Sequence, residues 1–83
     1  MTEWEFDPTS PKSRQIADEL EKRIRNGQYP PKHPLYEIRM VQEFGVARDT
    51  ARKAFNILRE RGFIFTVPGM GSFVSDPESW SQD

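Results

Sequence analysis

The stretch FGVARDTARKAFNILRERGFIFTVPGMGSFV, residues 44–74, decides the fold, because two kinds of hydrophobic pattern meet in it. In its first half the apolar side chains recur at helical spacing with charged side chains between them, and they are Ala51, Ala54, Phe55 and Leu58. This spacing predicts a helix over residues 48–61, about 21 Å long at a rise of about 1.5 Å per residue. Gly62 is placed to end that helix, since helices commonly terminate at glycine.

After Gly62 the pattern changes to that of a β-hairpin. Residues 63–67 (FIFTV) are β-branched and aromatic, which is a strand composition. Residues 68–71 (PGMG) have the composition of a turn, and residues 72–74 (SFV) form a second short apolar run. We therefore expect a hairpin with a four-residue loop directly after the helix.

A shorter helix is expected immediately before the helix at 48–61. Ile38, Val41 and Phe44 follow a helical period that predicts a helix over residues 37–43. Gly45 ends this pattern, and the next helix begins within three residues, so the two helices are joined by a tight turn.

The first helix begins near Ser10 and Pro11, a typical N-cap followed by proline at the first helical position. Its apolar spacing extends over residues 11–26, and the prolines within residues 30–34 then force an extended path. The order is thus helix, helix, tight turn, helix, hairpin. It predicts a mainly α fold with a small β-hairpin, namely a three-helix winged helix-turn-helix.

Composition excludes several classes of protein. A chain of 83 residues is the size of one domain, and it has no cysteine and a single histidine, His33, so neither a metal site nor a cofactor is expected. It shows no nucleophile–base pair and no phosphate-cradling glycine loop, which argues against an enzyme. No apolar run approaches the roughly 18 residues of a membrane span, and the N-terminus does not resemble a signal peptide. We expect a cytoplasmic protein with no membrane partner.

The net charge of −1 conceals an uneven distribution. All 12 basic residues lie between Lys12 and Arg61, whereas six of the 13 acidic residues lie outside residues 12–75, so that segment carries a net charge of +5. A basic core with acidic ends indicates an anionic partner. We divide the chain into an N-terminal arm (1–10), a winged-helix DNA-binding domain (11–75) and an acidic tail (76–83).

The polar face of the expected helix at 48–61 holds the candidate DNA contacts. Arg48 and Arg52 share one face, since residues four apart are neighbours on a helix, and Asp49 and Lys53 share the adjoining face. Arginine makes bidentate contacts to guanine, aspartate accepts from cytosine N4, and the Thr50 hydroxyl suits a phosphate. The alternative is an ordinary solvated amphipathic helix, but the tight turn before it and the hairpin after it favour DNA contact.

The hairpin loop is the second candidate contact. Gly69 and Gly71 flank Met70, and glycine supplies the positive φ that a plain turn requires. A loop without bulky flanks also suits a minor groove, and apolar side chains such as that of Met70 wedge into minor grooves in some proteins.

Three stretches carry a family resemblance: QIADELEKRIRNGQY, LYEIRMVQEFGVARDTARKAFNILRERGFI and VPGMGSFV, all within residues 15–74. They are similar to the N-terminal DNA-binding domain of the GntR family of bacterial transcription regulators. The resemblance implies a regulator, with a repressor as the first expectation, that binds palindromic double-stranded DNA. It places DNA-touching positions at Arg39, Arg48, Thr50, Arg52 and Gly69, and a variable position at Asp49.

The chain departs from the family pattern at several points. Residues 35–38 (LYEI) stand where the family has Leu-Pro-Ser-Glu, so the usual serine N-cap is missing, and Glu37 is the expected substitute. Ala47 replaces the serine that opens the recognition helix, which removes a hydroxyl cap. We expect altered DNA binding from these changes, and not a lost function.

A second function remains open at this point, that of a winged-helix protein-interaction module. The basic core and the Arg48/Arg52 face favour DNA, and retention on heparin would separate the two classes. No long apolar heptad or spare strand offers a strong dimer interface, so we expect a monomer that pairs weakly on DNA. A small-molecule effector is expected only if a C-terminal domain is missing from this sequence.

Overall fold

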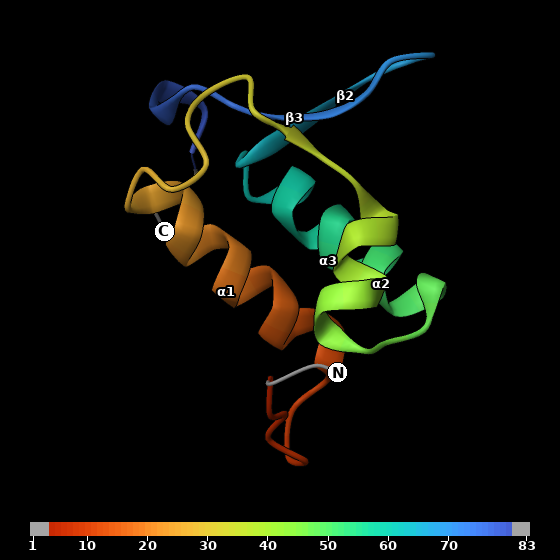
Figure 1. The fold of residues 1–83 in the computed structure, drawn as a ribbon. Coiled ribbons are helices and arrows are strands. Elements are labelled where there is room, and N and C mark those ends of the chain that lie inside the picture. The colour runs from red at the N-terminus through yellow and green to blue at the C-terminus, as the bar shows by residue number, and fades with distance from the viewer. Residues whose placement is uncertain (1–3, 81–83) are drawn as a thin grey trace.

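The computed structural model describes residues 4–80 and has the predicted architecture of three helices followed by a hairpin (Figure 1). The elements are α1 (Lys12–Arg25), β1 (Pro34–Leu35), α2 (Glu37–Phe44), α3 (Arg48–Glu60), β2 (Ile64–Val67), β3 (Gly71–Val74) and a 3-10 turn, η1 (Pro77–Ser79). Both the mainly α class and the winged helix-turn-helix are thereby confirmed. None of the helices in residues 4–80 is long and apolar enough to cross a membrane.

The core lies between α1 and α3, with α2 closing one side. The buried side chains of α3 are the predicted apolar stripe, Ala51, Ala54, Phe55 and Leu58. They pack on the buried face of α1, formed by Ile16, Ala17, Leu20 and Ile24, and α2 adds Met40 and Phe44. Burying a large apolar side chain contributes about 1.5–3 kcal/mol, so this packing fixes α3 with its charged face outward.

The sheet has three strands in the order β1-β3-β2, all antiparallel, whereas the sequence predicted only the hairpin. The additional strand, β1, lies in the segment expected to be extended, and its Leu35 is buried. Its pairing is continued by hydrogen bonds from Lys32 N to Val74 O (2.7 Å) and from Val74 N to His33 O (2.9 Å). The three prolines among residues 30–34 leave few backbone donors, so the sequence pattern did not indicate a strand here.

The hairpin loop is also shorter than expected. β2 ends at Val67 and β3 begins at Gly71, so the loop has three residues, 68–70, and not four. Val67 and Gly71 are paired across it, and the Met70 amide donates to Val67 O at 2.9 Å.

Two predicted helix caps are wrong. Ser10 does not cap α1, which begins at Lys12 after Pro11; instead the Gln15 side chain holds the preceding turn through Asp7 and the Ser10 carbonyl. Glu37 is the first helical residue of α2 and not its cap. The expected stop at Gly45 is confirmed, with a left-handed φ of 65°.

Both terminal segments pack on the domain. The ring of Trp4 meets Phe44 edge to face at 5.2 Å, and Trp80 stacks on Phe63 at 5.2 Å with the Arg25 guanidinium over its ring. Residues 1–3 of the predicted arm and 81–83 of the predicted tail lie outside the described residues. The described part of the acidic tail is therefore held against the core through an aromatic contact.

Candidate nucleic-acid interface

The exposed face of α3 begins with Arg48, its first residue, and continues one turn later with Arg52. Both side chains are exposed, as predicted from their spacing, while Thr50 between them is half-buried. Ala47 stands at the N-cap and supplies no side-chain hydrogen bond, so the first amide groups of α3 receive no cap from it. Free amides at a helix N-terminus favour an anion, and two arginines accompany them.

Asp49 and Lys53 form an ion pair on the adjoining face of α3. The Lys53 ammonium lies 3.3 Å from an Asp49 carboxylate oxygen, and both side chains are well exposed. Exposed ion pairs of this kind contribute about 0.3–0.5 kcal/mol to stability. Either side chain can therefore leave its partner readily for another charged or polar group. Lys53 is thus a weaker source of free positive charge than the arginines beside it.

Ion pairing separates the 12 basic residues into two groups. Four of them have carboxylate partners within the described residues: Arg23, Arg25, Lys53 and Arg61. The pKa of Arg61, for example, is raised by its hydrogen bond to Asp18, a residue of α1. The remaining eight have no ion pair there, and four of the eight lie on α2 and α3, namely Arg39, Arg48, Arg52 and Arg59. The helix-turn-helix therefore carries four arginines that no carboxylate holds within residues 4–80, and two of its acidic residues, Glu37 and Glu60, have no ion pair there either.

The hairpin projects from the helical part of the molecule as a wing (Figure 1). At its tip, Gly69 of the loop and Gly71 at the start of β3 have positive φ values of 80° and 116°, and Met70 between them is 72% exposed. A Cβ at either glycine would meet nothing within 4 Å, so the backbone conformation, and not crowding, selects glycine here. The loop therefore presents an open tip whose exposed side chains, Pro68 and Met70, are both apolar.

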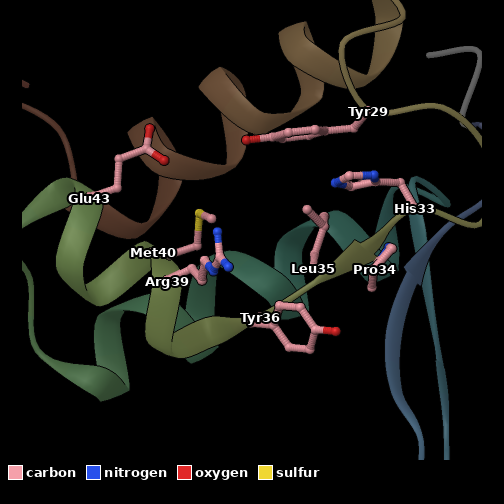
Figure 2. Close-up of a pocket in the computed structure, with 8 residues that line it drawn as sticks. All are labelled: Tyr29, His33, Pro34, Leu35, Tyr36, Arg39, Met40 and Glu43. Atoms are coloured by element: carbon pink, nitrogen blue, oxygen red, sulfur yellow. The ribbon is translucent and has the colours of Figure 1, made fainter.

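Arg39, the candidate on α2, lies beside a surface cavity of about 280 Å³ (Figure 2). On the opposite wall the Tyr29 ring stacks on His33 at 5.0 Å, and Glu43 is already paired with Arg23. No group of three His, Cys, Asp or Glu side chains able to hold a metal ion occurs among residues 4–80. Arg39 is therefore the one unpaired cation among the residues that line this cavity in the described chain.

Arg59 has a geometry that the sequence did not reveal. Its Nη1 donates to Asn56 Oδ1 at 2.7 Å, and its Nε donates to Thr66 Oγ1 at 3.0 Å. The Thr66 hydroxyl in turn lies 3.1 Å from that of Ser72 on the neighbouring strand. The helical pattern placed Arg59 on the polar face of α3, but its link to the wing depends on the turn at Gly62 and carries no sequence signal.

The fold and the exposed arginines define a DNA-binding winged helix-turn-helix. The family model for bacterial regulatory proteins of the gntR family matches residues 12–74. The chain belongs to that family, as its motifs predicted.

The similar proteins include well-defined regulators. The chain is 37% identical to the HTH-type transcriptional repressor NagR of Bacillus subtilis over 65 residues, which cover 77% of this chain and 27% of NagR. It is 32% identical to the arabinose metabolism transcriptional repressor of Geobacillus stearothermophilus over 75 residues, which cover 89% of this chain and 21% of that repressor. The chain thus spans about a quarter of the length of these relatives.

Solved structures agree in fold. The AraR DNA-binding domain in complex with operator ORR3 has a TM-score of 0.75 and 36% identity, with 87% of this chain and 86% of that one covered. A GntR family transcriptional regulator from Listeria monocytogenes has a TM-score of 0.79 and 26% identity, with 88% and 65% covered.

Proposed function

We propose that this domain binds operator DNA sequence-specifically as part of a cytoplasmic bacterial repressor, with α3 in the major groove and the 68–70 loop at the adjacent minor groove. The observation that carries the proposal is the set of arginines on α2 and α3 that have no ion pair within residues 4–80. The AraR DNA-binding domain, solved in complex with its operator, shares this fold, which supports DNA as the partner.

The residues divide between base reading and backbone contact. Arg48 and Arg52 lie one turn apart, about 6 Å along the helix axis, which spans about two base-pair steps of 3.4 Å. They suit guanine, and Asp49 suits cytosine N4 once it leaves Lys53. Arg39 and Thr50 suit phosphates, and Gly69, Met70 and Gly71 suit the minor groove. Lys53, released from Asp49, adds a further phosphate contact.

Selection from random duplex DNA tests this function directly. A sequence-specific regulator enriches a motif that the purified domain then binds more tightly than scrambled DNA. A winged-helix module for protein interaction would enrich no motif and would pass through heparin, and this outcome would replace the proposal.

Binding is expected to depend steeply on salt despite the sequence pI of about 5.8. If the domain neutralises about four phosphates, log K falls against log[salt] with a slope of about −3 to −4. Fluorescence anisotropy of a labelled duplex across a series of KCl concentrations measures this slope. A flat profile would show that the net charge, and not the local charge, governs the encounter.

The domain alone is expected to be a monomer that pairs on DNA. Most of its large apolar side chains are buried in one core. The exposed ones, such as Tyr36, Ile38 and Phe65, are too few to form a large dimer interface. One helix and one wing read only a few base pairs, so two copies on half-sites about one helical turn apart are needed for a palindrome. Sedimentation with and without palindromic DNA checks this: a dimer without DNA, or a 1:1 complex on the full palindrome, contradicts it.

The parts of the relatives that lie beyond the region matched here suggest where further functions reside. We propose that a small-molecule effector is bound only if the native protein carries a further domain, since these relatives extend well beyond the matched quarter of their length. Size measurement of the native protein tests this inference.

A further inference from the structure

Arg59 is an arginine held in place without being neutralised. Its two hydrogen-bond acceptors, Asn56 Oδ1 and Thr66 Oγ1, are both uncharged, and it has no ion pair within residues 4–80. The side chain is exposed. The guanidinium therefore keeps its full charge toward solvent while losing much of its freedom to move.

Arg61, two residues further on, shows that an arginine at this end of α3 can instead be paired with carboxylates. Arg61 contacts Asp18 and Glu21 on α1 at 2.8 and 2.9 Å and ties α1 to the end of α3. An arginine that only joins elements here is matched with carboxylates. Arg59 joins α3 to the wing through a threonine instead, which leaves the charge uncompensated.

Arg59 lies between α3 and the hairpin, where its charge can face the DNA backbone. Thr66 of β2 and Ser72 of β3 are direct register partners, and their hydroxyls lie 3.1 Å apart on the side of the wing that Arg59 reaches. Arg59 thus occupies the angle between the helix and the wing. When a helix occupies a major groove and a wing the next minor groove, one phosphate strand passes between them, because the backbone separates the grooves.

We propose that Arg59 binds a phosphate of the DNA backbone that separates the two grooves. Asn56 and the Thr66–Ser72 hydroxyl pair hold the Arg59 side chain in position for this contact. The inference rests on the proposed orientation of α3 and the wing. Arginine suits this role because several of its donors remain available after two are used, and a phosphate accepts a bidentate contact. The same network makes Thr66 and Ser72 positioning residues for the contact.

The matched pair of variants is Arg59→Gln and Lys22→Gln. Glutamine at position 59 removes the charge but retains a donor for Thr66. Arg59 and Lys22 are both exposed, so we expect both variants to fold. Lys22 is an exposed residue in the last turn of α1, outside the helix-turn-helix and the hairpin, and it has no ion pair within residues 4–80. Binding is measured on the duplex that the unsubstituted domain selects from random DNA.

Arg59→Gln is expected to weaken binding about tenfold at moderate salt and to reduce the magnitude of the salt slope by about 0.9. Lys22→Gln leaves both quantities unchanged. Thr66→Val, which keeps the charge but removes the anchor, weakens binding a few-fold with the slope near that of the unsubstituted domain. An unchanged slope in Arg59→Gln would overturn the contact, and normal affinity in Thr66→Val would overturn the positioning role.

Neutral methylphosphonates, placed one at a time in the same duplex, locate the contact. The unsubstituted domain is expected to lose affinity at a phosphate between the helix and wing footprints, and Arg59→Gln is expected to be insensitive at that position alone. Retained sensitivity there would overturn the proposal while leaving the function intact. A failure of the function itself looks different, because no motif is then selected and no footprint forms.

Discussion

Replacing Arg48 and Arg52 together with alanine is expected to abolish specific DNA binding in a domain that remains folded. Each arginine suits a bidentate guanine contact that contributes about 1–3 kcal/mol of discrimination, so their joint loss costs about 2–6 kcal/mol at the selected site. Both side chains are exposed and lie off the buried stripe of α3, so thermal unfolding should change little. Anisotropy on selected and scrambled duplexes measures the affinity, and circular dichroism follows the fold.

The control is Lys22→Ala, which removes a cation from α1 and should leave discrimination between the two duplexes intact. The double variant should bind both duplexes with similar, weak affinity, because the remaining phosphate contacts carry no sequence information. An unchanged preference for the selected duplex after both arginines are removed would contradict the assignment of α3 as the recognition helix.

The sequence was sufficient for the elements whose pattern is local and repeated. The stripe of Ala51, Ala54, Phe55 and Leu58 repeats with the period of a helix, and all four are buried. The change of period after Gly62 predicted the hairpin, and Gly45 predicted the tight turn between α2 and α3. Local patterns predict well here because tertiary packing uses the same faces that the periods define.

Features that depend on distant contacts were missed for a physical reason. The two-residue strand β1 exists because β3 offers it a partner, and its own residues include a proline that predicts an extended path but no strand pairing. The Gln15 contacts at the start of α1 require a turn at residues 7–10 that has no strong pattern. Neither feature repeats along the chain, so no period could reveal it.

The candidate site shows the same division. Helical spacing placed Arg48 and Arg52 on one exposed face, but spacing does not distinguish a free cation from one held by carboxylates. Arg61 and Arg59 look alike in the sequence, yet the first contacts Asp18, 43 residues away in the chain, and the second contacts only neutral groups within the described residues. Knowing which charges remain available required the packing of α1 and the wing against α3.

Gly62→Ala is expected to destabilise the domain by about 2–4 kcal/mol, through left-handed strain and overpacking together. Gly62 has a φ of 81°, and a Cβ there would lie 1.9 Å from the Ser79 carbonyl oxygen. That obstacle is backbone, so the segment carrying Trp80 must move and its stacking on Phe63 is lost. Urea unfolding measures the loss, and near-ultraviolet circular dichroism reports the aromatic packing.

Gly27→Ala separates the two causes. Gly27 has nearly the same φ, 86°, but a Cβ there would meet nothing within 4 Å, so only the strain of about 1–2 kcal/mol applies. Equal losses in the two variants would show that the return of residues 76–80 to the core adds nothing to stability. A larger loss of stability in Gly62→Ala, together with a reduced aromatic signal, would show that this acidic segment is part of the folded domain. Because Gly62 also sets the angle between α3 and β2, the same variant should disturb the link from Arg59 to Thr66 and weaken DNA binding beyond the effect of instability.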